Sequence, residues 1–361
     1  MDREKQPRPE LRRRGATANP PNRFHPISLD WDPEWLEQER INGELPSKVA
    51  TEYFDDTSRS VLARNDSPDV GFEFSLNPYR GCEHGCAYCY ARPTHEYLGF
   101  SAGLDFETRI MVKRDAAALL AKELAVPGWE PQPVALSGNT DCYQPVERRL
   151  GLTRACLEVF RERGNPVQII TKGALVLRDL DILRTMAADG LAAVAISVTT
   201  LDQPLSLKME PRAAVPAKRL EVIEKLAAAG ISTGVNVSPV IPGLTDHEMP
   251  SILTEAAARG ANWARYIMLR LPRGVEGIFL EWLEEHCPSR VGKVTSAIRE
   301  VRNGELSDSR FRTRMRGEGV RADAIADIFR IHCAKLGLEL QPPAPSLSRF
   351  RAPETAQQSL F

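Results

Sequence analysis

The chain has 361 residues, of which 42% are hydrophobic and 26% charged, and its formal net charge is −1. This composition is typical of a soluble enzyme with one large core or two smaller ones. The apolar runs are short and interrupted by charge, which excludes a transmembrane helix. The near-neutral balance provides no overall electrostatic footprint for nucleic acid, so any such contact has to be local.

The first 26 residues are rich in proline and arginine and poor in apolar residues, which predicts an unstructured segment. Within it, Arg12, Arg13 and Arg14 form a small basic cluster. A solvated tail is the favoured interpretation of this cluster, and an arm that contacts phosphate groups is the alternative.

The run GCEHGCAYCY, after the extended stretch FSLNPYRG, places Cys82, Cys86 and Cys89 on one loop. Soft thiolates select iron–sulfur clusters or zinc. A [4Fe-4S] cluster needs four ligands, so three cysteines leave one iron open to bind another molecule. The loop therefore predicts an iron–sulfur cluster with a vacant coordination position.

Zinc is the alternative metal, with His84 or His95 as a fourth ligand. Structural zinc sites usually pair two short knuckles, and no second CxxC occurs in the chain. A disulfide framework is also disfavoured, because seven is an odd number of cysteines and no secretory leader is present. We therefore expect a reducing, cytoplasmic location.

From about residue 72, short apolar or β-branched runs alternate with amphipathic helical stretches, which predicts parallel strands joined by crossover helices. The six predicted strands are FEFSLN near residue 74, VALSG from Val134, VQIITK from Val167, VAISVTT from Val194, STGVNVSP from Ser232 and ARYIML from Ala264. Helices are predicted from Thr153 to Gly164 and up to Gly230, with Thr and Gly at the cap positions.

The cysteine loop resembles that of the radical SAM superfamily, whose pattern is CxxxCxΦC with an aromatic residue at Φ, here Tyr88. The resemblance implies an α/β fold, the partial (β/α)6 TIM-like barrel of that superfamily, with the site at the carboxyl ends of the strands. It also implies that S-adenosylmethionine (AdoMet) binds the open iron and is cleaved reductively to methionine and a 5′-deoxyadenosyl radical.

The expected organisation has four parts. A basic N-terminal extension, flexible at its start, covers residues 1–70, and the barrel core covers residues 71–272. A C-terminal helical extension follows over residues 273–340, and a proline-rich tail over residues 341–361.

Polar residues at the strand ends are the candidates for binding the cofactor, with Tyr88 placed near the adenine. After the second strand, the segment SGNTD occupies the position of the superfamily's contact with the cofactor's amino group; its residues are Ser137, Gly138, Asn139, Thr140 and Asp141. An ordinary polar turn is the alternative for this segment. Lys172 and Ser197, after the third and fourth strands, resemble the lysine and serine that hold AdoMet in spore photoproduct lyases.

The resemblance to the spore photoproduct lyase-like branch covers roughly residues 70–245. It adds Glu210 and Arg212 as candidate site residues, with a surface ion pair as the alternative. In that branch a hydrogen-donating cysteine follows the second strand, but Gly138 stands in its place here. Cys142 is the candidate substitute, although its offset along an extended backbone points the thiol elsewhere.

Two features beyond the barrel suggest nucleic acid. Arg310, Arg312, Arg314 and Arg316 alternate with other residues, a spacing that fits either a phosphate backbone or a helical extension packed on the barrel. The chain ends in QQSLF, which resembles the bacterial sliding-clamp-binding pentapeptide through Gln357, Leu360 and Phe361. A plain disordered tail is the alternative for this last segment.

The leading hypothesis is a radical SAM enzyme that acts on nucleic acid, in DNA repair or base modification. It requires a [4Fe-4S] cluster, AdoMet, and a reductant such as flavodoxin or ferredoxin. The alternatives are a non-enzymatic DNA-associated protein with a structural metal site, and an electron carrier that uses the cluster without AdoMet. A simple carrier would fill all four cluster positions with cysteine, which disfavours the last.

Overall fold

The computed structural model describes residues 13–24 and 49–352. Its main sheet has the strand order β10-β9-β8-β7-β6-β3-β2. Six of these strands are parallel and follow one another in chain order: β3 (Phe74–Leu76), β6 (Val134–Leu136), β7 (Val167–Thr171), β8 (Ala192–Ser197), β9 (Ser232–Val240) and β10 (Trp263–Met268). The antiparallel strand β2 (Leu62–Arg64) pairs with β3 at one edge. All six predicted strands and the α/β partial-barrel class are confirmed.

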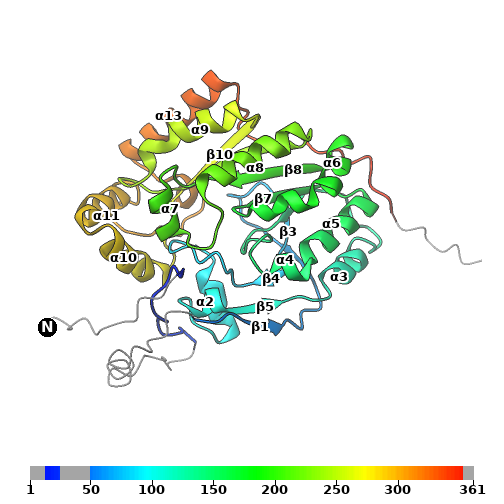
Figure 1. Ribbon diagram of the computed structural model, residues 1–361, viewed down its shortest axis with the longest axis horizontal. Coiled ribbons are helices and arrows are strands. Elements are labelled where there is room, and N and C mark those ends of the chain that lie inside the picture. The colour runs from blue at the N-terminus through cyan, green and yellow to red at the C-terminus, as the bar shows by residue number, and fades with distance from the viewer. Residues whose placement is uncertain (1–12, 25–48, 353–361) are drawn as a thin grey trace, which may run out of the picture.

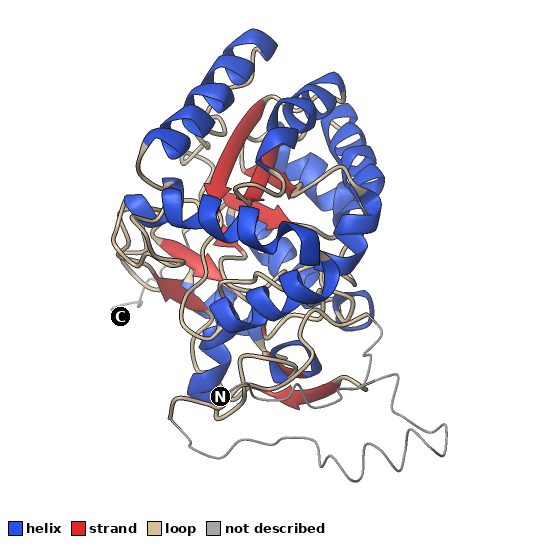
Figure 2. Ribbon diagram, turned by 90° about the vertical axis from the view of Figure 1, so that its left-hand side faces the viewer, coloured by secondary structure: helices blue, strands red, loops and turns tan. Residues whose placement is uncertain are grey.

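Helices surround the main sheet, which lies in the interior of the molecule (Figure 2). The crossover helices of the barrel are α3 (Ala116–Glu123), α4 (Glu147–Leu150), α5 (Leu152–Arg163), η2 (Ala174–Asp179), α6 (Leu180–Ala188), α7 (Gln203–Met209), α8 (Pro216–Ala228), η3 (Asp246–Glu248) and α9 (Met249–Ala258). Their apolar sides and the outward faces of the strands form the main core, which includes Ile169, Val194, Val235 and Leu253.

The caps of the two predicted helices differ in detail from the expectation. Helix α5 does end at Gly164, which has a φ of 64° in the left-handed region that glycine tolerates. It begins before Thr153, however, and the Thr153 hydroxyl donates to the carbonyl of Cys142 at 2.6 Å instead of capping the helix. Helix α8 begins with Pro216 at its first turn, where the missing N–H costs no hydrogen bond.

A second, three-stranded sheet adjoins the cysteine loop. It contains β1 (Glu52–Asp55), β5 (Arg109–Val112) and β4 (Tyr79–Arg80), in the order β1-β5-β4. The helical segments η1 (Arg92–Leu98) and α2 (Asp105–Thr108) connect the cysteine loop to β5. The loop therefore begins directly after β4 and is bounded on both sides by regular structure.

Four α-helices and a short 3-10 helix follow the barrel in the described part of the chain: α10 (Val275–His286), η4 (Pro288–Arg290), α11 (Val291–Glu300), α12 (Thr313–Arg316) and α13 (Val320–Leu336). Helix α13 lies beside α9, and α10 and α11 lie together on the side of α7 (Figure 1). Residues of α10 and α11, such as Phe279 and Ile298, pack in one apolar cluster with Ala87 and Tyr88 of the cysteine loop. The extension thus shields the loop from solvent.

The expectation of an unstructured start is wrong for residues 13–24. Ala16 is buried, and the backbone N–H groups of Gly15 and Ala16 donate to the carboxylate of Glu107 at 3.1 and 2.8 Å. Arg14, expected in a solvated tail, donates to the carbonyls of Glu107 and Val49. Composition does not reveal this order, because the partners lie far away in the sequence. Arg12 and the remaining N-terminal residues before it lie outside the described residues.

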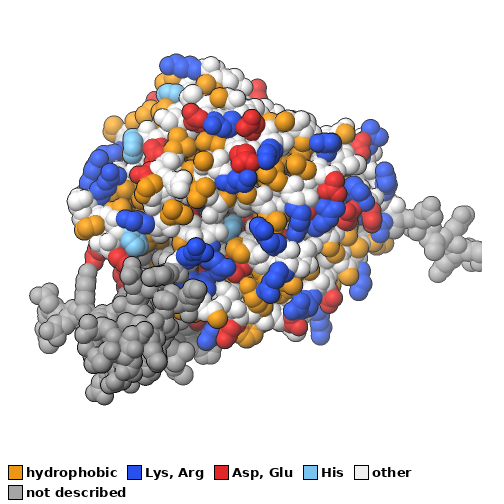
Figure 3. All heavy atoms as spheres, in the orientation of Figure 1, with side chains coloured by type: hydrophobic (Ala, Val, Ile, Leu, Met, Phe, Trp, Pro, Cys, Tyr) orange, Lys and Arg blue, Asp and Glu red, His pale blue; other side chains and the backbone are white. Residues whose placement is uncertain are grey.

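No helix among the described residues is long and apolar enough to cross a membrane. Lys, Arg, Asp and Glu side chains are interspersed on the face seen in Figure 3, without a large area of one sign. Contacts to a charged partner on that face would therefore depend on individual side chains.

One buried histidine predicts a pH dependence of stability. Burial lowers the pKa of His95 from 6.5 to about 4, so the unfolded chain binds more protons in that window. Stability is therefore lost as the pH falls from about 6.5 toward 4. We expect His95→Gln to lose less melting temperature than the parent between about pH 7 and pH 5. The exposed His247→Gln is the control, and equal losses in all three proteins would contradict the assignment.

Candidate radical SAM site

The cysteine loop is fixed by backbone hydrogen bonds to two other segments. The N–H of Cys82 donates to the carbonyl of Phe106 at 2.9 Å, and that of Ala87 to the carbonyl of Met209 at 3.0 Å. Gly85, between the first two cysteines, has a φ of 67°, and a Cβ there would lie 2.6 Å from the Glu107 carboxylate. A glycine is required at this position because of both the conformation and the close approach.

A buried ion pair between Arg92 and Glu107 packs against the cysteine loop. Their side chains form an ion pair at 2.5 Å and are both fully buried. The Arg92 guanidinium also donates twice to the carbonyl of Cys86, at 3.0 and 2.9 Å. The ion pair therefore links the N-terminal segment to the central cysteine.

The three thiols fit an iron–sulfur cluster. Burial raises the pKa of Cys86 to about 12 and also raises that of Cys82 and Cys89, so cluster binding has to release protons. In the described part of the chain, no three His, Cys, Asp or Glu side chains lie close enough together to hold a single metal ion. The thiolates of a [4Fe-4S] cluster each bind a different iron and need no such grouping.

The histidines of the zinc alternative are engaged elsewhere. His84 Nδ1 lies 3.3 Å from Asp141 Oδ2. His95 is fully buried, with Nε2 2.8 Å from the carbonyl of Arg109 and its ring against Phe106. Cys142, Cys156 and Cys333 lie in the main hydrophobic core, and Cys287 packs in the helical layer against the apolar cluster that also contains Cys86.

Four predicted site residues come together beside the loop. The Tyr88 hydroxyl donates to the buried carboxylate of Glu210, which also pairs with Arg219 and accepts from Thr199 Oγ1 at 2.7 Å. Lys172 Nζ lies 5.7 Å from the centre of the Tyr88 ring. Ser197, at the end of β8, is buried, and its carbonyl accepts from Arg219 at 3.1 Å.

In this group Glu210 has cationic partners, whereas Lys172 forms no ion pair with a described residue. Burial would raise the pKa of Glu210, but Arg219 and Lys172 outweigh it and hold the pKa at about 2. Glu210 is thus an anion that orients Tyr88 and Arg219. Lys172 forms no ion pair with any described carboxylate within 4.0 Å. Its ammonium group remains free to bind a carboxylate from outside the chain.

The segment after β6 is organised by residues that the sequence did not single out. Asn77 Oδ1 accepts from the N–H groups of Asn139 and Thr140 at 2.9 and 3.3 Å. Ser137 Oγ donates to the Thr140 carbonyl, and the Tyr90 hydroxyl donates to the carbonyl of Gly138. The segment is therefore a turn held close to the cysteine loop, with Asn139 exposed.

Asp141 has a positioning role in the structure. Its two oxygens accept from Thr171 Oγ1 at 2.6 Å and from the N–H groups of Lys172 and Tyr143 at 2.7 and 2.9 Å. Burial would raise its pKa, but His84 and these donors hold the pKa below its usual range. The side chain ties the turn after β6 to strand β7 and to the loop.

Two predicted residues lie apart from the group around Tyr88. Arg212 contacts the cysteine loop instead: its backbone N–H donates to the carbonyl of His84 at 3.2 Å, and its guanidinium donates to the buried Glu83 Oε1 at 2.9 Å. Cys142 is fully buried in the main core with its thiol 3.7 Å from the carbonyl of Leu136. That thiol does not face the polar group around Tyr88, so we assign it no role in the reaction.

The arginine-rich segment is partly neutralised by the protein itself. Arg310 pairs with Asp308 and Glu318, and Arg314 pairs with Asp69 at 2.5 Å. For these two side chains the packing interpretation therefore holds. The residues of the clamp-like tail, Gln357, Leu360 and Phe361, lie outside the described residues.

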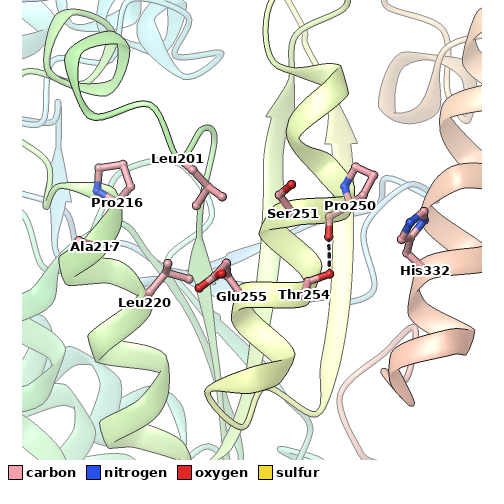
Figure 4. Close-up of a pocket in the computed structure, with 9 residues that line it drawn as sticks. All are labelled: Leu201, Pro216, Ala217, Leu220, Pro250, Ser251, Thr254, Glu255 and His332. Carbon is pink, nitrogen blue, oxygen red and sulfur yellow. Dashed lines mark hydrogen bonds between the residues drawn. The ribbon is translucent and has the colours of Figure 1, made fainter.

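A surface pocket of about 430 Å³ lies elsewhere, among the outer helices. Pro216 and Leu220 of α8 line one side, Pro250 and Glu255 of α9 the other, and His332 of α13 lies beyond (Figure 4). None of the predicted site residues lines it.

The fold and the three-cysteine loop define a radical SAM protein, and comparison with known proteins agrees. The model of the radical SAM superfamily matches residues 76–256. An uncharacterized protein of Mycobacterium tuberculosis is 39% identical over 230 residues, covering 63% of this chain and 68% of the relative. The radical SAM Nalpha-GlyT isomerase of Pseudomonas phage M6 is 25% identical over 187 residues, covering 51% and 37%.

A solved structure of a spore photoproduct lyase double mutant, with bound AdoMet and dinucleoside spore photoproduct, has a TM-score of 0.53 at 17% identity, over 82% of both chains. This likeness concerns the fold. The chain belongs to the radical SAM superfamily and is a radical SAM enzyme. The non-enzymatic and electron-carrier alternatives are thereby set aside.

Proposed function

We propose that this enzyme reductively cleaves AdoMet and uses the resulting 5′-deoxyadenosyl radical on a nucleic-acid substrate, in DNA repair or base modification. Cys82, Cys86 and Cys89 would hold a [4Fe-4S] cluster, which when bound supplies the electron that breaks the bond between sulfur and the 5′ carbon. The superfamily implies both cofactors. The observation that carries the proposal is the free Lys172 ammonium beside Tyr88 and Glu210, next to the cysteine loop.

Each side chain has a defined part in this proposal. The Lys172 ammonium binds the AdoMet carboxylate, since it lacks a carboxylate partner among the described residues. Glu210 keeps the Tyr88 ring in place, so that a face of the ring is available to the adenine. Ser197, and the turn from Ser137 to Thr140 that Asp141 anchors, supply hydroxyl and backbone groups for the amino acid and ribose parts.

The nucleic-acid part of the proposal has two supports. The solved structure with the matching fold contains a dinucleoside photoproduct as its ligand. The chain also presents arginines that no carboxylate of the described residues neutralises, which are considered below. The implied partners are a reductant such as flavodoxin or ferredoxin, DNA, and the sliding clamp through Gln357, Leu360 and Phe361.

Anaerobic reconstitution tests the central claim. The protein should become brown, contain iron and sulfide, and convert AdoMet to 5′-deoxyadenosine when dithionite is added. A fully loaded cluster that releases no 5′-deoxyadenosine would refute the proposal. One zinc ion without sulfide would support a structural metal site instead.

Replacing Lys172 by methionine is expected to weaken AdoMet binding by about 10- to 100-fold, because a charged hydrogen bond to the carboxylate is lost. The cluster should load, since Lys172 is not a thiolate ligand and its charge reaches Cys86 and Cys89 only through space. The measurement is the change that AdoMet produces in the electron paramagnetic resonance spectrum of the reduced cluster. Lys225→Met, on the outer surface of α8, is the matched control. Unaltered AdoMet affinity in Lys172→Met would remove this residue from the site.

A further inference from the structure

A row of polar side chains crosses three neighbouring strands at one level of the sheet. Ser197 of β8 pairs in register with Asn236 of β9, which pairs in register with Arg265 of β10. Paired residues of adjacent parallel strands point to the same face. The neighbours Val235 and Val237 lie in the core under the helices, so Asn236 points to the opposite, inner face. Asn236 and Arg265 therefore extend a row of polar side chains that begins at Ser197, the residue of this row that is assigned to the cofactor. We call these three residues the cofactor row.

The two residues added to this row lack partners. Asn236 is 6% exposed, and its Oδ1 has no hydrogen-bond partner. Arg265 forms no ion pair or side-chain hydrogen bond among the described residues; its guanidinium carbon lies 5.8 Å from the centre of the Trp263 ring, and a Cβ built on Gly71 would lie 3.7 Å from its Nη2. Burial lowers the pKa of this guanidinium. A buried amide oxygen is normally paired, so Asn236 leaves an acceptor open to a ligand, and the half-buried Arg265 beside it has no carboxylate partner among the described residues.

A second unpaired arginine lies farther along the same chain segment. Arg270 follows β10 and stacks over the Tyr90 ring, with 5.2 Å between guanidinium carbon and ring centre. Its described hydrogen-bond contact is the sulfur of Met315 at 3.4 Å. Tyr90 directly follows the last cysteine of the loop and is 43% exposed.

The spacing favours a polymeric anion over a small one. Arg270 lies five positions after Arg265, which corresponds to up to about 16 Å of extended chain. Such a spacing matches a strand with several phosphates, each guanidinium contacting a different one. The exposed Tyr90 ring beside Arg270 offers a stacking surface for a base.

We propose that Arg265 and Arg270 bind the phosphate backbone of a single-stranded or unpaired stretch of nucleic acid, with Asn236 accepting a hydrogen bond from the bound nucleotide. This inference rests on the proposed function, because it places the substrate strand across the inner face beside the cofactor row. It assigns substrate binding to β10 and the residues after it.

The test uses the reconstituted enzyme and a fluorescently labelled oligothymidylate, with anisotropy as the readout. Arg265→Gln and Arg270→Gln should each weaken binding by roughly tenfold. Each should also reduce the slope of log K against log salt by about 0.7, the value for one contact to a single strand. Arg330→Gln, which removes the same charge from the exposed face of α13, should bind like the parent.

A second measurement distinguishes a role of Arg265 in binding the cofactor from a role in binding the substrate. AdoMet affinity, read from the electron paramagnetic resonance change of the reduced cluster, is measured on Arg265→Gln beside oligothymidylate affinity, and the oligothymidylate affinity should fall by the larger factor. A loss of AdoMet binding would identify Arg265 as a cofactor ligand and overturn the inference. Displacement of the oligothymidylate by a glutamate-rich peptide at equal concentration would identify a peptide carboxylate site and also overturn it.

A variant that keeps the charge serves as the control for misfolding. Arg265→Lys keeps the cation and should retain more binding than Arg265→Gln at equal iron and sulfide content. The proposed site would be refuted if Arg265→Gln and Arg270→Gln both bound oligothymidylate as tightly as Arg330→Gln does. If the parent binds the oligonucleotide but never cleaves AdoMet, the proposed chemistry fails while the binding site stands.

Discussion

Replacing any one of Cys82, Cys86 and Cys89 by alanine is expected to give a protein without a stable cluster and without AdoMet cleavage. Each thiolate is a direct iron ligand in the proposal. Removing a hydrogen-bond partner of a ligand lowers metal affinity by about 10- to 100-fold, so removing the ligand itself should lower the cluster affinity by more. Iron and sulfide content, the visible spectrum and 5′-deoxyadenosine formation measure the effect.

Cys142→Ala is the matched control for these variants. Its thiol lies in the hydrophobic core and contacts the carbonyl of Leu136, away from the loop. The variant should therefore load the cluster and form 5′-deoxyadenosine as the parent does. A cluster retained in all three loop variants would show that the loop does not hold the metal.

Glu107→Gln is expected to have the largest effect on stability. The Glu107 carboxylate neutralises the fully buried Arg92 and accepts from the N–H groups of Gly15 and Ala16. Removing its charge leaves the guanidinium buried and unpaired, which costs about 3–5 kcal/mol. Because Arg92 also donates to the carbonyl of Cys86, the cluster content should fall together with the melting temperature.

The matched control is Glu255→Gln, which breaks an exposed i,i+4 ion pair with Arg259 on α9. Such a pair contributes about 0.3–0.5 kcal/mol, so the melting temperature should hardly change. Thermal unfolding of the apoprotein and iron content after reconstitution are the measurements. Equal stability of the two variants would mean that the Arg92 charge is compensated in another way.

Local spacing accounts for the features that could be predicted. The three cysteines lie within eight residues, so their shared loop follows from covalent connection alone. The strand ends could be predicted because apolar runs of strand length stop at polar residues, as at Thr171 and Lys172. The carboxyl ends of parallel strands share one edge, which is why Lys172 and Ser197 lie on the same side as the loop.

Side-chain direction accounts for the features that were missed. Arg212 and Glu210 are two residues apart, yet Glu210 faces Tyr88 and Arg219 while Arg212 faces Glu83. Asp141 was assigned to the cofactor, but the structure commits both of its oxygens to the backbone and side chains around it. These choices depend on partners contributed by distant segments, which no local pattern specifies.

The sequence by itself determined the class of chemistry and the order of the strands, because the ligand spacing and the alternation of apolar runs are local properties. Only the tertiary structure decided which charges are neutralised within the protein and which remain available. Glu107 and Gly15 are 92 residues apart, and Arg265 meets Asn236 through strand register alone. Pairings of this kind are fixed by packing the whole sheet, so they emerge only once every strand has its neighbours.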